Sequence, residues 1–161
     1  MVQNVMDPSH IGMSLYSDTE GGFSVWLPRS WHKRELNPDH QGMLFSPDTN
    51  ELNTFFLVEK RALEVEVTKE DVGTLREGFK QGLMSLPGIE ILSNDETLAD
   101  EMQLFDAIYT FLEGEERRIR WMRCLYWGNR QLIFIAQGRT QEDFEQWLPL
   151  LYKTMTTPQI L

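Results

Sequence analysis

The chain has 161 residues, of which 41% are hydrophobic and 11% aromatic, so it can bury the core of one domain and is too apolar to stay disordered. Its 25 acidic and 15 basic residues give a net charge of −10, which repels nucleic-acid phosphates and anionic lipid headgroups. No apolar run reaches the roughly 18 residues that a membrane-spanning helix needs. We therefore expect an acidic protein without nucleic-acid binding or membrane insertion.

The N-terminal third predicts short strands separated by turns. Residues 1–14 are polar and include Asp7-Pro8, which disfavours a helix, so we expect a loose arm followed by a single domain at 15–157. Apolar or alternating runs predict strands at 15–17, 23–27, 43–45 and 54–58, of which 54–58 is apolar on both faces and is therefore expected in the sheet interior. Residues 29–42 carry mixed charge and predict a loop around Trp31.

Two amphipathic helices are predicted, at 69–86 and 140–155. Thr68, with Asp71 three residues later, resembles a capping box, and Thr140 is a suitable N-cap for the second helix. Three glycines inside the first helix each weaken it by roughly 1 kcal/mol relative to alanine. Tertiary packing must therefore hold this helix, and we expect the missing side chains to allow close approach to a sheet. A strand at 89–93 follows, at a sheet edge.

Residues 102–138 contain three apolar-alternating runs separated by two turn signals, which is the pattern of a β-meander. Gly128-Asn129 has glycine first, as a type II′ turn requires, and Gly114-Glu115 is the other expected tip. These tips place Asp106 opposite Arg123, Ile108 opposite Trp121, Tyr109 opposite Arg120, Phe111 opposite Arg118, Leu125 opposite Leu132 and Trp121 opposite Ala136. A slip of one residue would set Ile108 opposite Arg120, so the hydrophobic pairing favours the same register.

This order of elements predicts an α+β fold. We expect an α/β/α sandwich around a mainly antiparallel sheet of six to seven strands. Two helices do not necessarily cover both apolar faces of such a sheet. Any uncovered apolar patch would mark a surface for another protein or for a second copy of the chain.

The segment from Arg117 to Arg123 contains the basic patch of the sequence, and it has two interpretations. One is contact with phosphates; the other is a strand whose arginines lie on aromatic neighbours and pair with acidic residues. Strand alternation sends Arg118 and Arg120 to one face and Arg117 and Arg123 to the other, which favours the second interpretation. The register also brings four residues together as a candidate ligand or partner site: Tyr109, Arg118, Arg120 and Gln137. An arginine flanked by a phenol and an amide suits a carboxylate or phosphate.

No sequence motif of a nucleophilic, metal-dependent or cofactor-dependent enzyme is present, so we predict no catalytic residue, no metal and no cofactor. Cys124, the single cysteine, is expected to be a buried structural thiol and fits a reducing compartment, the cytoplasm. Asp106 could serve as a buried acid or base, but opposite Arg123 it is better interpreted as the ionised member of a structural ion pair.

Residues 23–31, FSVWLPRSW, follow the pattern F-x-apolar-x-x-P-x-x-W. This pattern resembles the opening of the superfamily that includes the photosystem PsbP subunits, the yeast Ran-release factor and bacterial DcrB-like proteins. The resemblance implies that short strands, a helix, a meander and a C-terminal helix follow over residues 15–157. It also implies a non-enzymatic role in binding or assembly, and some cytoplasmic bacterial relatives are chaperones that shield hydrophobic segments of type VI secretion effectors.

Two functions remain open on this basis. The first is a cytoplasmic, non-catalytic protein-binding or chaperone-like module, whose partner is another protein or a second copy of the chain. The second is a binder of a small anionic ligand, or an enzyme, that uses a pocket near Tyr109, Arg120 and Gln137.

Overall fold

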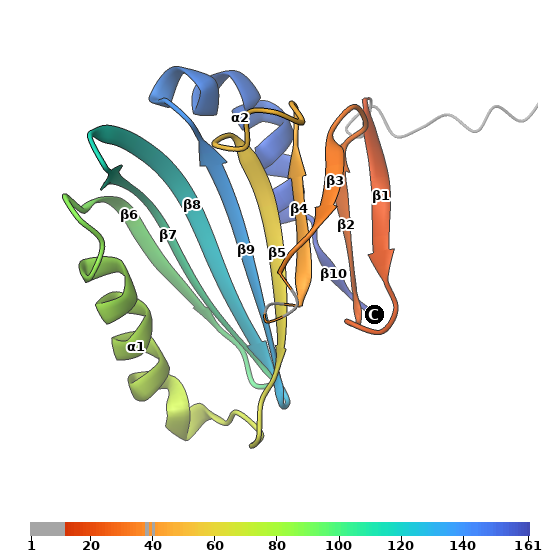
Figure 1. The fold of residues 1–161 in the computed structure, drawn as a ribbon. Coiled ribbons are helices and arrows are strands. Elements are labelled where there is room, and N and C mark those ends of the chain that lie inside the picture. The colour runs from red at the N-terminus through yellow and green to blue at the C-terminus, as the bar shows by residue number, and fades with distance from the viewer. Residues whose placement is uncertain (1–11, 38, 40) are drawn as a thin grey trace, which may run out of the picture.

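The structure is a computed structural model that describes residues 12–37, 39 and 41–161. Its centre is a seven-stranded antiparallel sheet in the order β3-β4-β5-β9-β8-β7-β6 (Figure 1). The strands are β3 (His32–Glu35), β4 (Gly42–Ser46), β5 (Phe55–Ala62), β6 (Glu90–Leu98), β7 (Met102–Glu113), β8 (Glu116–Trp127) and β9 (Arg130–Gly138). The α+β sandwich predicted from the sequence is confirmed, and β5 lies inside the sheet as expected.

The meander has the predicted register. Tyr109 pairs with Arg120, Asp106 with Arg123, and Trp121 with Ala136, and the tips lie at Gly114-Glu115 and Gly128-Asn129. Gly114 and Gly128 have φ of +64° and +54°, while no described non-glycine residue has a positive φ. A positive φ at the first turn residue alone is the type II′ pattern, which matches the twist of the flanking strands.

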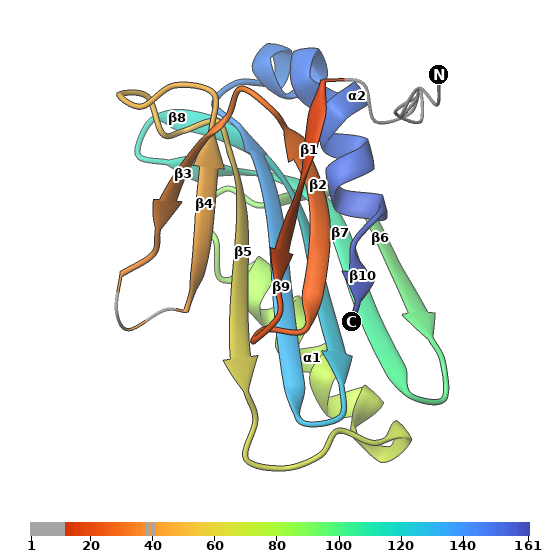
Figure 2. The same ribbon diagram turned by 90° about the vertical axis from the view of Figure 1, so that its right-hand side faces the viewer.

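One face of the large sheet is covered by a second, three-stranded sheet and by α2 (Gln141–Thr156), as Figure 2 shows. The small sheet contains β1 (Met13–Asp18), β2 (Phe23–Pro28) and β10 (Gln159–Ile160), with β2 in the middle. The sequence predicted strands at 15–17 and 23–27 but gave no sign that they form a separate layer. Phe23, Val25 and Leu27 of β2 are buried against the large sheet, so the FSVWLPRSW segment has a structural role.

Trp31 and the N-terminal end of α2 complete this core. The Trp31 ring meets the Trp147 ring edge-on, with centroids 5.1 Å apart. Thr140 caps α2 as predicted, because its hydroxyl accepts a hydrogen bond from the Asp143 N–H at 3.1 Å. A Cβ on Gly138 would lie 2.5 Å from the Cβ of Phe144, so α2 approaches the end of β9 closely only because residue 138 has no side chain.

The other face of the large sheet is covered by α1 (Val72–Met84), which follows a short 3₁₀ turn at Lys69–Asp71. The predicted capping box is present, since the Asp71 carboxylate accepts the Thr68 N–H at 2.8 Å. The expected role of the helix glycines is wrong. A Cβ on Gly73, Gly78 or Gly82 would meet no atom within 4 Å, so these glycines leave space beside α1 and do not permit closer packing.

Three segments differ from the sequence prediction. Residues 29–42 are not one loop, because His32–Glu35 forms edge strand β3 with all four residues exposed. β6 lies at the opposite edge as predicted but runs to Leu98, five residues beyond 89–93. Residues 1–11 of the predicted arm lie outside the described residues, whereas Met13 and Ser14 belong to β1. The domain boundaries stay a prediction.

Candidate functional site

The face of the large sheet that carries α1 is only partly covered by it. Figure 1 shows α1 beside β6 and β7, with β9, β5 and β4 further from the helix. Leu44, Leu57 and Ile135 lie side by side in one cross-strand row, and Phe55 lies beside Gln137 in the next row. All four are only partly buried, and none of Leu44, Phe55 and Leu57 belongs to a buried core cluster among the described residues. We call these four residues the open face.

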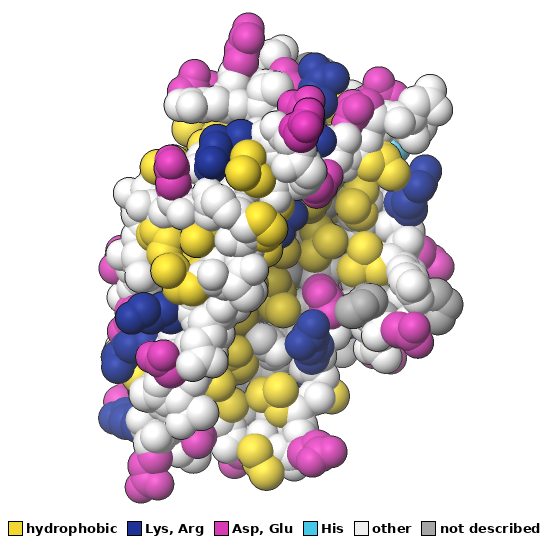
Figure 3. Space-filling model, turned by 60° about the vertical axis from the view of Figure 1, so that its left-hand side comes forward, with side chains coloured by type: hydrophobic (Ala, Val, Ile, Leu, Met, Phe, Trp, Pro, Cys, Tyr) yellow, Lys and Arg dark blue, Asp and Glu magenta, His cyan; other side chains and the backbone are white. Residues whose placement is uncertain are grey.

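A groove lies between α1 and the sheet, and we call it the α1 groove. It encloses about 310 Å³. Its helix wall contains Gly78, Phe79, Gly82 and Leu83, and its floor contains Arg120, Met122, Cys124 and Tyr126 of β8 with Ile133 and Ile135 of β9. Figure 3 shows hydrophobic side chains gathered in a hollow on this side of the molecule, with charged side chains around it. A cavity of this size is at the lower end of the range for small-molecule sites.

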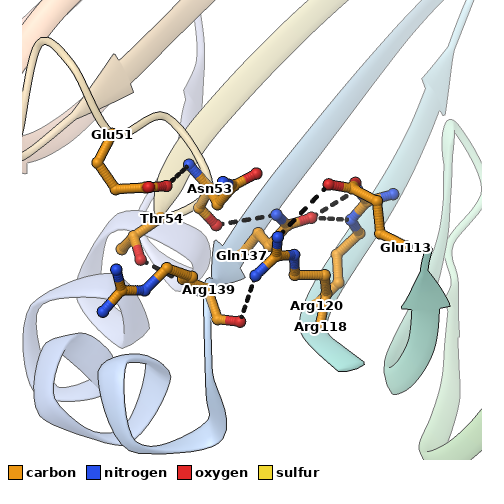
Figure 4. Close-up of polar contacts among 8 residues, drawn as sticks. All are labelled: Glu51, Asn53, Thr54, Glu113, Arg118, Arg120, Gln137 and Arg139. Carbon is orange, nitrogen blue, oxygen red and sulfur yellow. Dashed lines mark hydrogen bonds and ion pairs between the residues drawn. The ribbon is translucent and has the colours of Figure 1, made fainter. Parts of the chain in front are cut away.

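Arg120 lies at one end of the α1 groove. Its partner Gln137 lies outside the groove lining (Figure 4). The Nε and Nη2 atoms of Arg120 both donate to Oε1 of Gln137, at 3.0 and 2.6 Å. Gln137 is 1% exposed, and its Nε2 donates to the Asn53 carbonyl oxygen at 2.9 Å. The amide nitrogen is held by a carbonyl, so the amide oxygen faces the guanidinium. The Arg120 guanidinium also lies over the Phe111 ring, 4.5 Å from its centroid.

Tyr109 and Arg118 flank this pair on the same face. The Tyr109 hydroxyl donates to Sδ of Met122 at 3.9 Å. Burial raises the pKa of Tyr109 despite the neighbouring Arg120 charge, so the phenol stays protonated at neutral pH. Arg118 donates to the Arg139 carbonyl oxygen at 2.9 Å and lies 3.7 Å from the Glu113 carboxylate. The four predicted site residues are therefore neighbours, although only Tyr109 and Arg120 belong to the groove lining, and Arg118 and Gln137 lie outside it.

The far end of the α1 groove is also polar. Gln131 Nε2 donates to the Tyr126 hydroxyl oxygen at 2.9 Å and lies 3.1 Å from the Cys124 sulfur. Burial raises the pKa of both Cys124 and Tyr126, which keeps the thiol and the phenol protonated. Cys124 is buried, as predicted, and in its neutral form it is a poor nucleophile.

The remaining arginines of the basic segment, Arg117 and Arg123, lie on the opposite face of the sheet. Arg123 Nε lies 3.1 Å from Asp106 Oδ2, and Arg117 donates to the Thr110 hydroxyl at 3.0 Å. The predicted division of the arginines between two faces is confirmed, as is the ion pair of Asp106. Burial nevertheless raises the pKa of Asp106 and outweighs the effects of Trp121 and Arg123, which the sequence did not indicate.

The sequence predicted a pocket near Tyr109, Arg120 and Gln137 but did not indicate that α1 forms one wall of a groove there. The available signal was the spacing of Gly78 and Gly82, which are four residues apart and therefore share one helix face. Glycine spacing alone does not distinguish a helix that packs closely from one that leaves a groove. In the part of the chain that the structure describes, no three His, Cys, Asp or Glu side chains gather as metal ligands would.

This architecture is similar to that of several solved structures. The cyanobacterial PsbP protein (CyanoP) of Synechocystis sp. PCC 6803 matches with a TM-score of 0.66 at 15% identity, over 98% of this chain and 96% of that one. The chain has the PsbP/Mog1 fold. The resemblance predicted from FSVWLPRSW is thus confirmed at the level of the fold.

Two further structures with this fold match over most of their length. LpqN of Mycobacterium tuberculosis, described as involved in cell envelope biogenesis, has a TM-score of 0.61 at 10% identity over 97% of this chain and 87% of that one. The Ran-binding protein Mog1p of Saccharomyces cerevisiae has a TM-score of 0.53 at 9% identity over 92% and 95%. No protein-family model and no curated protein sequence matches the chain significantly. Within the described residues, no helix is both long and apolar enough to cross a bilayer.

Proposed function

We propose that this chain is a non-catalytic, chaperone-like protein-binding module of the cytoplasm that holds apolar side chains of a partner on the open face. The observation that carries the proposal is the row formed by Leu44, Leu57 and Ile135, extended by Phe55, which lies on a sheet face that α1 covers only in part. Contiguous apolar surface of this kind marks interaction sites in monomeric proteins.

Two further points support the proposal. Mog1p, which shares the fold, is described as Ran-binding, so this architecture can present a protein-binding surface. Two charged groups beside the apolar row, Arg61 and Glu59, pair with each other at 3.0 Å. An apolar centre with a charged rim is the usual composition of a protein interface.

Site-specific photocross-linking in cells tests the proposal. A photoreactive phenylalanine analogue is placed at Leu57, at Phe55 and, as the control, at Tyr152, which is 59% exposed on α2. We expect the two open-face positions to cross-link to the same protein and Tyr152 to cross-link to none. The mass of the product distinguishes another protein from a second copy of this chain. Equal cross-linking at Tyr152, or no protein product from Leu57 and Phe55, would contradict the proposal.

A further inference from the structure

We propose that the α1 groove binds a long-chain carboxylate, with its carboxylate on Arg120 and its hydrocarbon chain between α1 and the strands β8 and β9. This inference goes beyond the proposed function and does not depend on it. The groove and the open face share Ile135 but otherwise use different residues.

The positive charge of Arg120 at one end of the groove favours an anionic ligand. No carboxylate among the described residues forms an ion pair with Arg120, although the chain carries 25 acidic residues. The buried Gln137 amide orients the guanidinium by accepting from Nε and Nη2, and the Tyr109 hydroxyl lies beside the same guanidinium, so a ligand carboxylate would approach Nη1 next to this phenol. A guanidinium that is fixed in place and lacks a counter-ion is a preorganised carboxylate site.

A single negative charge fits this end better than two. Arg118, the next arginine on the same face, already has Glu113 at 3.7 Å, so its charge is partly compensated. The Gln137 oxygen already accepts from two of the guanidinium donors, so fewer donors remain for the three oxygens of a phosphate monoester. These features favour a carboxylate over a phosphate monoester.

The apolar lining in the middle of the groove favours a hydrocarbon chain. Between its polar ends the walls contain Phe79, Leu83, Met122, Ile133 and Ile135, and no charged side chain lies among them. The floor from Arg120 to Tyr126 covers seven residues of β8, and the six steps between them span about 20 Å at roughly 3.3 Å per residue. An extended chain of about ten to sixteen carbons occupies most of this length, given C–C bonds of about 1.5 Å.

The helix wall keeps this space open. Gly78 and Gly82 line the groove, and a Cβ on either would meet no atom within 4 Å, so a larger side chain at these positions has room to extend over the groove. Glycine costs a helix about 1 kcal/mol relative to alanine. Two glycines that face one cavity are therefore better explained by the cavity than by the helix.

A peptide suits the groove less well than a lipid. A backbone placed between Phe79 and Ile133 would lose the water bound to its N–H and C=O groups and would find no polar side chain there. A hydrocarbon chain carries no such groups.

Binding of sodium hexadecanoate, measured by displacement of the fluorescent fatty acid cis-parinarate, tests the inference. We expect Arg120→Met to weaken hexadecanoate binding at least tenfold, and hexadecanol, which lacks the charge, to bind the wild-type protein at least tenfold more weakly than hexadecanoate. We also expect affinity to rise along the series from decanoate to hexadecanoate, because each added methylene is buried.

A matched pair of helix substitutions separates blocked binding from misfolding. Gly82→Leu fills the groove while improving helix propensity, whereas Gly73→Leu makes the same change outside the groove lining. We expect Gly82→Leu to abolish binding without lowering the unfolding temperature, and Gly73→Leu to bind as the wild type does.

Four results would overturn the inference. They are equal binding of hexadecanol and hexadecanoate, tighter binding of hexadecyl phosphate, displacement by an apolar peptide with a free C-terminal carboxylate in preference to hexadecanoate, and undiminished binding by Gly82→Leu. Cross-linking at Leu57 is unaffected by any of these results, so failure here and failure of the proposed function are distinguishable.

Discussion

Asp106 illustrates what one residue's environment adds to its sequence context. Its carboxylate pairs with Arg123 and accepts the Trp121 indole N–H, while Asp95 lies directly opposite on β6. The ion pair follows from the strand register, and the sequence predicted it. The direction of the pKa shift does not follow, because burial depends on α2 and on the small sheet, which pack over this face.

The substitution Asp106→Asn tests whether the pKa of Asp106 is raised in the folded protein. Burial raises the folded-state pKa of Asp106 above its ordinary value of 3.8, so the folded protein holds this proton more tightly than the unfolded chain does. The contribution of this group to stability is therefore fully present below pH 3.8 and is lost as pH rises through the folded-state pKa. Asparagine does not titrate, so the free energy of unfolding of the wild type should fall relative to the variant over that range.

Urea unfolding of both proteins at several pH values from 3.5 to 7 measures the difference. Titrating groups that do not interact with Asp106 contribute equally to the two proteins and cancel in the comparison. If the wild type instead gains stability over the variant as pH rises, Arg123 dominates the environment and the pKa of Asp106 is lowered.

At the scale of elements, the strands with apolar alternation were predictable and the polar ones were not. The meander was predicted with its register because each hairpin had both a glycine turn and a hydrophobic pattern. β3 was missed because its sequence, HKRE, is exposed along its whole length and has no alternation to detect. α1 was predicted from its apolar spacing, but the groove beside it depends on the position of the helix over the sheet.

The two helices differ in how firmly they are held, and this difference predicts their local stability. α2 has four buried residues, whereas α1 has one, Leu83, and contains three glycines. We expect the amides of α1 to exchange with solvent deuterium faster than those of α2, by local opening of the helix. Hydrogen exchange followed by mass spectrometry measures both, with β9, in the sheet interior, as the protected reference. Equal protection of α1 and α2 would show that α1 opens only in global unfolding.

At the scale of the whole molecule, the sequence established the fold class but not the layers. Six of the seven strands of the large sheet, both helices and their order were predicted, and FSVWLPRSW indicated the PsbP-like arrangement. The separate small sheet was not predictable, because β10 pairs with β2 across more than a hundred residues and carries only two residues of its own. The open face follows from the same layering, since the small sheet and α2 both cover the opposite face.

The net charge and the open face together predict how the protein behaves in acid. At pH 7 a charge of −10 opposes self-association, but the sequence pI is about 4.7, so repulsion weakens as pH falls toward 5. The partly exposed apolar side chains of the open face then drive association. We expect the weight-average mass from sedimentation velocity to rise between pH 7 and pH 5, and to rise less for Leu57→Gln, which leaves the charge unchanged. Tyr152→Gln, which removes an exposed aromatic side chain from α2, is the matched control and should behave as the wild type. If both variants reduce association equally, general surface hydrophobicity is responsible and the open face has no special role.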